Sequence, residues 1–395
     1  MAKPVRYGQP EGDAELRAYA AIVAQTFAGD TPSFEEWVRA FGLENLRILR
    51  GAGVLAGLTI YRMGQFFGGR SVPTWGIAGV AVPPELRGGG LGRELMAANL
   101  AEQFEHGPAL STLYPAVPEL YRSLGWEFAG VRSSLRMRLA DLPRDSGAIE
   151  IRPATIADDA LIRDIYTRRH RHENGCLDRS ERIWERVRRA PKDTPVGGYL
   201  ALRDHTPVGY LLYLQKRDVP GRFAFDIAVR DLVAVDADAA RAMLAFLARH
   251  RSVAREITLV ASPHDPLLRE LMRTQEVPAE SQMAWMLRIV RVKEALEARG
   301  YNPHVAAKLR MTLQDDTLPG NAGHWSLELA DGQMRATQGG KGGPALDVRG
   351  LAALYAGHHS PAELRAAGLL SGKDEGDAAL AAMFAGPAPW MPDFF

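Results

Sequence analysis

The sequence has few cysteines, little net charge and no long hydrophobic runs, and each of these shortages excludes some kinds of site or partner. It contains one cysteine, Cys176, among 395 residues, which excludes a disulfide within the chain and a metal cluster built on cysteines. Its 48 Lys and Arg nearly balance its 47 Asp and Glu, for a formal net charge of +1. So balanced a chain has no global field to attract nucleic acid or an anionic membrane, and we expect no nucleic-acid partner.

Long hydrophobic runs are also absent. No stretch approaches the roughly 20 apolar residues that span a bilayer, and the N-terminus has no apolar signal core. We therefore expect a cytoplasmic protein without a membrane span, with secretion left open. The histidines His264, His358 and His359 lack the spacing of metal ligands, so we expect no metal cofactor.

The most informative stretch is VAVPPELRGGGLGR, residues 80–93. It is typical of a strand, a short turn, a glycine-rich loop and a helix, which we expect over residues 91–104. Glycines have no Cβ, so their backbone amides can approach a ligand closely, and the positive end of the helix points at the same loop. The stretch therefore predicts a pyrophosphate site. Two arginines flank the loop and can add charge-assisted hydrogen bonds, Arg87 and Arg93.

Three alternatives to this site differ in the residues that they need. A Walker loop requires Gly-Lys-Ser/Thr, which does not follow here. The dinucleotide fingerprint is G-x-G-x-x-G, whereas this loop has the spacing G-x-G-x-G, with Arg93 at the position of the last glycine. A glycine-rich helix entry that binds no ligand is the third alternative.

The pattern V-x-V-x-P-x-x-R-G-x-G-x-G resembles motif A of the GNAT superfamily of N-acetyltransferases. In that family the loop holds the pyrophosphate of acetyl-CoA. The strand before it splays from its neighbour and hydrogen-bonds the pantetheine arm. We also expect Ala116 and Val117 to contact acetyl-CoA. The resemblance assigns cofactor binding to Val80, Ala81, Val82, Arg87, Gly88, Gly89, Gly90, Leu91, Gly92 and Arg93.

The order of expected strands and helices divides the chain into segments. Residues 1–145 fit a complete GNAT domain, whose sheet we expect residues 131–139 to close. A polar linker precedes a second β/α cycle, residues 146–288, that repeats the architecture. At the position of the phosphate loop this copy has Val-Asp-Ala-Asp-Ala-Ala, residues 235–240, with two acids and no glycine. Because carboxylates repel a pyrophosphate, we expect a degenerate copy that binds no CoA.

The last segment, residues 289–395, combines helical and β-like stretches. Three further helical stretches follow its β-like runs, and a proline-rich tail ends in two aromatic residues. A tail so apolar is expected to lie buried in a groove. The first helix is expected at 292–300, and the β-like runs at 307–314, 325–329 and 333–337.

Over its whole length the chain resembles the Eis-type acetyltransferases, the "enhanced intracellular survival" family. The resemblance implies an α/β (α+β) fold. An active GNAT domain occupies residues 1–145 and a degenerate one residues 146–288. Residues 289–395 form an α+β domain like a sterol carrier protein, whose tail reaches the active site. Self-association as a homohexamer is also implied. The resemblance rests on the glycine loop and on residues 120–126, 262–267, 294–301, 351–358 and 393–395.

The implied reaction is direct attack of a primary amine on the thioester of acetyl-CoA in a ternary complex. Cys176 has no base motif around it, so we expect no covalent step through it. In the family, the tyrosine of a Y-x-x-x-G stretch protonates the departing thiolate, and Tyr121 matches that tyrosine, with Gly125 as the glycine. The family's base is the α-carboxylate of the last residue, here Phe395. Its reference pKa of about 3.3–3.7 makes it a poor base alone, so we expect it to orient a water relay. Core packing of Tyr121 and a hydrophobic plug formed by Phe394 and Phe395 are the alternatives.

By resemblance, the first helices and the tail line the acceptor pocket. Aromatic walls with carboxylates suit cationic amines such as aminoglycosides, polyamines or lysine side chains. Two other functions stay open: protein lysine acetylation, which needs an open cleft, and lipid carriage through an apolar tunnel in the last segment. The arginines of residues 163–189 alternate with acids, and we expect them to form a solvated face. Expected acceptor contacts are Phe27, Asp30, Trp37, Asp393 and Phe394.

Overall fold

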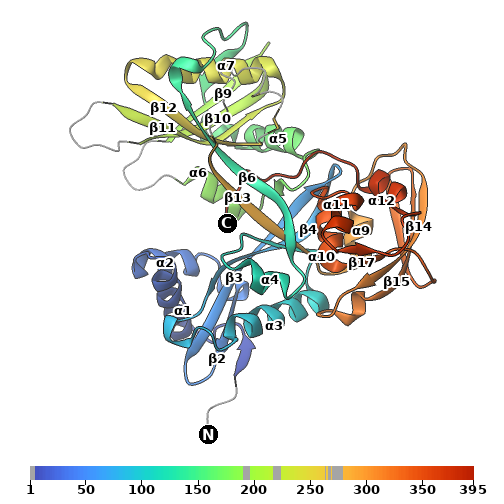
Figure 1. Cartoon of the computed structure of the whole chain (residues 1–395). Helices are drawn as coiled ribbons and strands as arrows, with labels where there is room; N and C mark the ends of the chain where they lie inside the picture. Colours follow the sequence, from blue (N-terminus) through green and yellow to red (C-terminus); the bar gives the residue numbers. More distant parts are fainter. Residues whose placement is uncertain (1–4, 190–195, 217–223, 263, 266–267, 269–278) are drawn as a thin grey trace. The chain divides into compact units, whose positions relative to one another are not determined.

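The structure is a computed structural model that describes residues 5–189, 196–216, 224–262, 264, 265, 268 and 279–395 (Figure 1). The chain divides into two compact units. Unit 1 consists of Met1–Ala129, Trp285–Pro387 and Phe395, and unit 2 of Gly130–Ala284 and Ala388–Phe394. The segment limits expected from the sequence stay a prediction. The stretch 262–267, which contributes to the resemblance, lies partly outside the described residues.

Unit 1 is built on a mixed sheet. Neighbouring strands are antiparallel except β4 and β5, which run parallel. Only the end of β13, residues 286–289, pairs with β5. In sheet order the strands are β1 (Arg6–Gly8), β2 (Leu46–Arg50), β3 (Val54–Phe67), β4 (Arg70–Ala81), β5 (Leu110–Leu113) and β13 (Ala279–Ile289).

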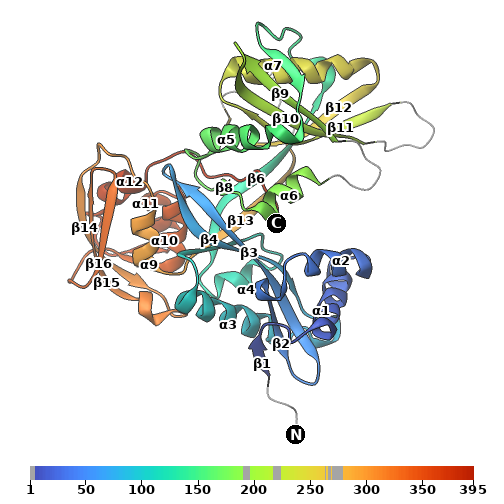
Figure 2. The same ribbon diagram turned by 180° about the vertical axis from the view of Figure 1, so that it is seen from behind.

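Helices cover both faces of this sheet, with α1 (Asp13–Thr26) and α2 (Thr31–Arg39) on one and α3 (Leu91–His106) and α4 (Pro118–Arg122) on the other. Figure 2 shows α1 and α2 beside β2 and β3. On their face, the Tyr19 hydroxyl donates to the Gly79 carbonyl oxygen at 2.8 Å. On the other face, apolar side chains of α3, α4 and the strands form one buried cluster. The sheet is therefore held between two helical layers.

One strand corrects an expectation from the sequence. Residues 131–139 were expected to close the first sheet, but the later part of β6 (Glu127–Arg138) pairs with β12 (Ala254–Ala261) in unit 2. The neighbour of β5 is instead the end of β13, where Met286 lies opposite Leu113. An alternating apolar pattern specifies a strand and its buried face, but it does not specify which sheet edge the strand joins.

The third segment forms a separate sheet of five strands within unit 1. The turn between its first two neighbours has Asp331 and Gly332 at positive φ, as a two-residue hairpin requires. The strands at 307–314, 325–329 and 333–337 and the helix at 292–300 were predicted from the sequence. The sheet order is β16 (Gln333–Gln338), β15 (Gly323–Ala330), β14 (Ala307–Gln314), β17 (Ala345–Asp347) and β18 (Leu370–Ser371). Its helices are α9 (Val292–Ala298), α10 (Val348–Ala356), α11 (Pro361–Ala366) and α12 (Asp377–Phe384).

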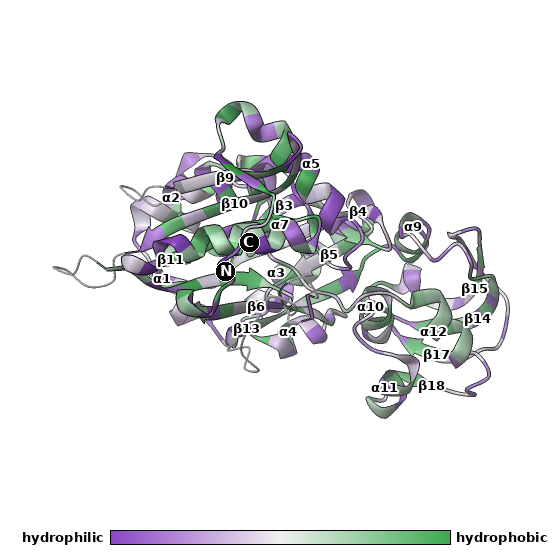
Figure 3. Cartoon of the chain, turned by 90° about the horizontal axis from the view of Figure 1, so that it is seen from above, coloured by the Kyte–Doolittle hydropathy of each residue, from purple (hydrophilic) through white to green (hydrophobic). Residues whose placement is uncertain are grey.

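Unit 2 repeats the strand order of the first sheet, with β11 and β12 as its parallel pair. Helix α7 (Ala237–Ala248) buries most of its alanine, leucine and methionine side chains in the core of this unit. Figure 3 colours its ribbon by the hydropathy of each residue. The internal repeat predicted from the sequence is therefore present. The order is β7 (Glu150–Pro153), β9 (Val196–Arg203), β10 (Thr206–Lys216), β11 (Phe225–Ala234), β12 and β6, with the further elements β8 (Leu177–Asp178), α5 (Asp159–His170) and α6 (Glu181–Arg188).

Two further properties concern only the part of the chain that the structure describes. None of its helices is both long and apolar enough to cross a membrane. Within the same residues, no three His, Cys, Asp or Glu side chains gather in a way that could hold a metal ion.

Candidate active site

The glycine loop folds into an open nest at the start of α3. Gly88 and Gly90 have φ values of 82° and 85°, and Gly90 caps the helix without a side-chain hydrogen bond. A Cβ built on either residue would meet no heavy atom within 4 Å. The left-handed backbone, and not crowding, therefore requires glycine here. The amides of the first helical turn have no side-chain cap and are available to an anion.

Arg87 and Arg93 are held at the two ends of this nest. The Arg87 Nε donates to the Val82 carbonyl oxygen at 3.0 Å, and its guanidinium reaches the Thr26 hydroxyl at 3.3 Å. Arg93 donates to the hydroxyl of Ser123. Among the described residues, neither arginine forms an ion pair with a carboxylate, so both positive charges remain available to a phosphate.

Strands β4 and β5 part beside the nest. Their parallel ladder runs from Thr74 opposite Leu110 to Ile77 opposite Leu113 and ends there. Strand β4 continues to Ala81 with β3 as its neighbour on the other side. The segment with Val80, Ala81 and Val82 therefore lies beyond the paired stretch and borders a gap between two parallel strands. An extended ligand can pair with such an edge.

The opposite side of this gap is formed by the chain after β5. Ala116 is exposed and Val117 is 52% exposed, immediately before α4 begins at Pro118. Leu91 and Gly92 lie in the first turn of α3, and a Cβ on Gly92 would lie 3.7 Å from Leu120 of α4. The structure therefore brings the residues expected to bind the cofactor to the parting strands and the starts of two helices.

Tyr121 lies in α4 and is buried in the cluster beneath the sheet, 5% exposed. Burial raises the pKa of its hydroxyl to about 12, so the group keeps its proton at neutral pH. The turn after it is fixed by Gly125, which has φ 90°, and by Arg288, whose Nε donates to the Leu124 carbonyl oxygen at 3.0 Å. A side chain at Gly125 would lie 2.8 Å from the Arg288 guanidinium carbon. The positive φ and the close approach of Arg288 thus explain why the residue four positions after Tyr121 is glycine.

Phe395 is buried in unit 1, with 6% of its surface exposed. Its ring centroid lies 5.5 Å from that of Tyr61 and 5.6 Å from that of Tyr114. Tyr61 continues a row of aromatic contacts through Phe41 to Trp37. The last residue of the chain and the second helix therefore belong to one aromatic surface on the α1 and α2 face of the sheet.

Three residues of the first helices were expected to contact the acceptor. Phe27 ends α1 and is 49% exposed. Asp30 is exposed and caps α2 by accepting from the Ser33 amide at 2.9 Å. Trp37 lies against Gly79, where a Cβ would be 3.0 Å from its ring. Trp37 thus reaches the parting strand, whereas Asp30 already serves the helix as its cap.

The other two expected acceptor residues belong to unit 2. Asp393 is buried, and its carboxylate accepts from the Arg179 Nε at 3.0 Å. Phe394 is 39% exposed, with the Arg186 guanidinium 5.5 Å from its ring centroid. Asp393 therefore has a structural partner within its own unit.

Family models match three parts of the chain. Residues 9–129 and residues 175–289 each match an acetyltransferase (GNAT) domain, and residues 292–392 match a sterol carrier protein domain. This order agrees with the internal repeat and with the separate third sheet.

Solved structures resemble the chain over its whole length. A GCN5-related N-acetyltransferase of Anabaena variabilis is 34% identical with a TM-score of 0.94, and the match covers 99% of this chain and 100% of that one. One from Kribbella flavida is 33% identical with a TM-score of 0.87, covering 100% and 99%. The chain belongs to the GCN5-related N-acetyltransferases. Within this family it is of the Eis type: N-acetyltransferase Eis of Mycobacterium tuberculosis is 29% identical over 316 residues, 77% of this chain and 75% of that protein.

The protein is accordingly an acetyltransferase with two GNAT domains and a sterol carrier protein domain. The second GNAT domain differs from the first at the start of its corresponding helix. Asp236 caps α7 by accepting from the Ala239 amide at 3.0 Å and pairs with Arg203 at 2.8 Å. A carboxylate thus takes the place that an anion would occupy at this helix end, which supports the expectation of a degenerate copy.

Other polar groups of the second GNAT domain are paired among themselves. Arg163 pairs with Asp159 and Glu181. Cys176 is fully buried with its sulfur 3.8 Å from His170 Nδ1, and burial raises the pKa of its thiol well above the ordinary value. The protonated thiol is a poor nucleophile. These contacts agree with an inert cysteine, while the Arg163 side chain is only 28% exposed and the solvated arginine face stays a prediction.

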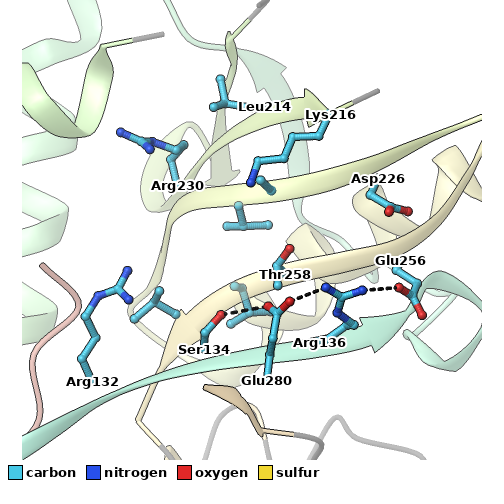
Figure 4. A pocket seen from close by; sticks show the side chains of 14 residues that line it. Arg132, Ser134, Arg136, Leu214, Lys216, Asp226, Arg230, Glu256, Thr258 and Glu280 are labelled. Carbon is cyan, nitrogen blue, oxygen red and sulfur yellow. Dashed lines mark hydrogen bonds and ion pairs between the residues drawn. The ribbon is translucent and has the colours of Figure 1, made fainter. Parts of the chain in front are cut away.

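A polar cavity of about 290 Å³ opens on the sheet of unit 2 (Figure 4). Glu280 accepts from Ser134 at 3.4 Å and pairs with Arg136, which also pairs with Glu256 at 3.0 Å. The carboxylates neutralise the guanidinium between them, and we assign this cavity no catalytic role.

Sequence reasoning missed the residues that hold the tail. Nothing in the local sequence marks Tyr61, Tyr114 and Arg179, because the tail residue that each of them contacts lies more than 200 positions away. Gly76 does carry a local signal, because a glycine inside a strand often marks a close approach by another part of the chain.

Proposed function

We propose that the protein transfers the acetyl group of acetyl-CoA to a primary amine by direct attack. The observation that carries this proposal is the open glycine nest at the start of α3, beside the point where β4 and β5 part. Uncapped amides and the helix dipole favour a pyrophosphate. The edge with Val80 and Val82 suits an extended pantetheine arm, which would hydrogen-bond as an added strand does.

In the proposed reaction, the amine nitrogen forms a bond to the thioester carbonyl carbon, and the bond from that carbon to sulfur breaks. The Tyr121 hydroxyl donates its proton to the departing sulfur, so that CoA leaves as a thiol. The reacting amine attacks in its neutral form, and its nitrogen loses one proton through water to the terminal carboxylate of Phe395. The carboxylate releases that proton to solvent, and solvent returns one to Tyr121. Amide and thiol are the products, and atoms and charges balance.

We propose a cationic amine as the acceptor. Phe27 and Trp37 supply aromatic surface on the α1 and α2 face, and aromatic faces attract cations. Asp30 adds a negative charge there, because the hydrogen bond from the Ser33 backbone lowers the pKa of its carboxyl. Asp393 is left out of this pocket, since its carboxylate is buried and pairs with Arg179.

The test offers acetyl-CoA to the purified protein with a panel of amines: an aminoglycoside, spermidine, a lysine peptide and an uncharged aromatic amine. Release of CoA thiol is followed with a chromogenic thiol reagent. We expect the fastest release with the aminoglycoside or spermidine. A preference for the peptide would favour protein lysine acetylation instead. No release with any amine, together with no heat on titration of acetyl-CoA, would refute the proposed activity.

Removal of Phe395 tests the role of the terminal carboxylate. The shortened chain ends in Phe394, so the carboxylate moves back by about 3.5 Å. We expect turnover to fall by about ten-fold or more, while the dissociation constant for acetyl-CoA stays the same. Unchanged turnover would remove the terminal carboxylate from the mechanism.

The remaining expectations follow from the family resemblance. Self-association as a homohexamer stays a prediction. A lipid carrier would need an apolar tunnel in the third segment, but the inner face of its sheet packs Met311, Leu313 and Trp325 into a buried core. We therefore prefer the acetyltransferase function for the whole chain.

A further inference from the structure

The ring of the last residue occupies a position that a side chain would otherwise take. Gly76 lies in the middle of β4. A Cβ built on it would lie 2.8 Å from Cε2 and 3.1 Å from Cδ2 of Phe395, and 2.6 Å from the methyl carbon of Met63. Carbon atoms cannot approach that closely, so a side chain at this position and the seated ring exclude one another.

The register of the sheet explains why the ring lies there. Tyr61 of β3 and Thr112 of β5 are directly opposite Gly76, so all three share one face of the sheet. Tyr114 follows two residues after Thr112. The ring of Phe395 lies between the rings of Tyr61 and Tyr114, at 5.5 Å and 5.6 Å. Two tyrosines thus form the walls of a seat, and the vacant side-chain position of Gly76 forms its floor.

Backbone conformation does not explain this glycine. Gly76 has no positive φ, so any residue could adopt its extended geometry. Glycine inside a strand is unfavourable by roughly 0.5–1 kcal/mol relative to alanine. A glycine at such a position therefore points to a neighbour that needs the space, and the neighbour here is the ring of the C-terminal residue.

The seat lies next to the reaction site proposed above. The last paired residues of β4 and β5 are Ile77 and Leu113, one position after Gly76 and one before Tyr114. We propose that Gly76, Tyr61 and Tyr114 are positioning residues that hold the Phe395 ring, and through it the terminal carboxylate, at the mouth of the gap between the two strands. This inference rests on the proposed function of that carboxylate.

The central experiment is the substitution Gly76→Ala in the full chain. Displacement of the ring by about 1 Å should lower kcat by ten-fold to a hundred-fold. The dissociation constant for acetyl-CoA, measured by calorimetry, should remain within about two-fold, because the glycine nest is unchanged. Wild-type kcat in this variant would overturn the inference.

Two second-site variants identify which contact matters. Phe395→Val keeps the terminal carboxylate but removes the ring atoms that meet the new methyl group. Phe395→Val alone should also lower kcat, because no ring then holds the carboxylate, and adding Gly76→Ala to it should lower kcat no further, since the clash is gone. Met63→Ala removes the other close neighbour and should not restore kcat. Restoration of kcat in Gly76→Ala by Met63→Ala, or a full further loss when Gly76→Ala is added to Phe395→Val, would contradict the seat.

A readout independent of catalysis separates this inference from the proposed function. A buried terminal residue resists carboxypeptidase, so Gly76→Ala should release Phe395 faster than the wild type does, as followed by mass spectrometry. Gly53→Ala is the matched control, because a Cβ there meets nothing within 4 Å, and it should leave both release and kcat unchanged. If Gly76→Ala speeds release while kcat stays at the wild-type value, the ring is seated but does not position the reaction, and the inference is wrong. If the wild type transfers no acetyl group, the proposed function fails, and the release rates still test the seat.

Discussion

Tyr121 shows how burial sets the protonation state of a residue in the proposed site. Its side chain lies among Leu124, Trp126 and other apolar groups of the buried cluster. Burial raises the pKa of the phenol to about 12. The neutral, protonated form is therefore the stable one at every pH at which the protein would work. The phenol therefore carries its proton before the thiolate forms, as the proposed donor must, while the same burial makes it a weaker acid than an exposed tyrosine.

The substitution Tyr121→Phe tests this role. It removes only the hydroxyl, so packing should change little, while kcat should fall by about ten-fold or more. Because the phenol stays protonated below pH 12, the ratio of wild-type to variant kcat should be constant from about pH 7 to pH 10. Initial rates of CoA release over this range measure it. Full activity of the variant would mean that Tyr121 serves only in packing. A ratio that changes steeply with pH would mean that the phenol titrates between pH 7 and pH 10.

Charged residues show what a sequence leaves open at this scale. Asp30 and Asp393 are both carboxylates near aromatic residues in the sequence, and both were expected to contact the acceptor. In the structure, Asp30 caps a helix and Asp393 accepts from a buried arginine. Residue type predicts the chemistry that a side chain can perform, but only the fold determines which partner uses that capacity.

At the scale of elements, the glycine loop combines a backbone conformation with a helix end. Gly90 is at once the last loop residue, with φ 85°, and the N-cap of α3. Its left-handed conformation leads the chain into a first helical turn that has no side-chain cap. The loop therefore depends on the conformation of glycine, and not only on its small size.

The substitution Gly90→Ala should weaken acetyl-CoA binding. An L-residue in this conformation costs about 1–2 kcal/mol, and the loop can relieve this strain by leaving the shape that binds the pyrophosphate. We expect the dissociation constant, measured by calorimetry, to rise by about ten-fold. The control is Gly147→Ala, which has φ 59° and no atom within 4 Å of a Cβ. It introduces similar strain in unit 2, which does not contain the loop, and should leave the dissociation constant unchanged. Equal effects of both variants would contradict a specific role for Gly90.

Local patterns predicted most elements of the fold, and pairing between distant strands was the part they could not predict. The glycine loop, the helix over 91–104 and the strands of the third segment follow from patterns within a few residues of each other. The exchange at the sheet edges does not. Strand β6 follows the helices of the first GNAT domain in the sequence, but its later part pairs with β12 of unit 2. The end of β13, which follows β12 in the sequence, pairs with β5 of unit 1. Both choices satisfy the same alternating pattern, so sequence periodicity cannot separate them.

On the scale of the whole molecule, the chain's tail is fixed by a buried ion pair. Residues 388–394 belong to unit 2, although the segment before them belongs to unit 1. Arg179 is 1% exposed and contacts Asp231 at 2.6 Å and Asp393 at 3.0 Å, while its guanidinium carbon lies 3.9 Å from the Tyr166 ring centroid. Tyr210 donates to Asp231 at 2.6 Å. One cation thus pairs with two buried carboxylates that are 162 residues apart in the sequence.

Arg179→Met should destabilise unit 2 strongly. It keeps much of the side-chain volume but leaves two buried carboxylates without a counter-charge, and breaking a buried pair in this way costs about 3–5 kcal/mol. Urea unfolding, followed by circular dichroism, should show a clearly lower midpoint. The matched control is Arg203→Met. The side chains of Arg203 and its partner Asp236 are 40% and 37% exposed, so their ion pair should contribute less than about 1 kcal/mol to the free energy of unfolding.

A triple variant separates lost charge balance from lost packing. Adding Asp231→Asn and Asp393→Asn to Arg179→Met removes both uncompensated charges, while the amides can still accept from Tyr210 and Tyr166. The urea midpoint should recover most of its decrease. The single variant is destabilised chiefly because it buries unpaired charges, and less because an attraction is lost. If the triple variant unfolds as early as Arg179→Met, the arginine stabilises the tail by packing against Tyr166 and Trp184. If Arg179→Met unfolds no earlier than Arg203→Met, the ion pair does not anchor the tail.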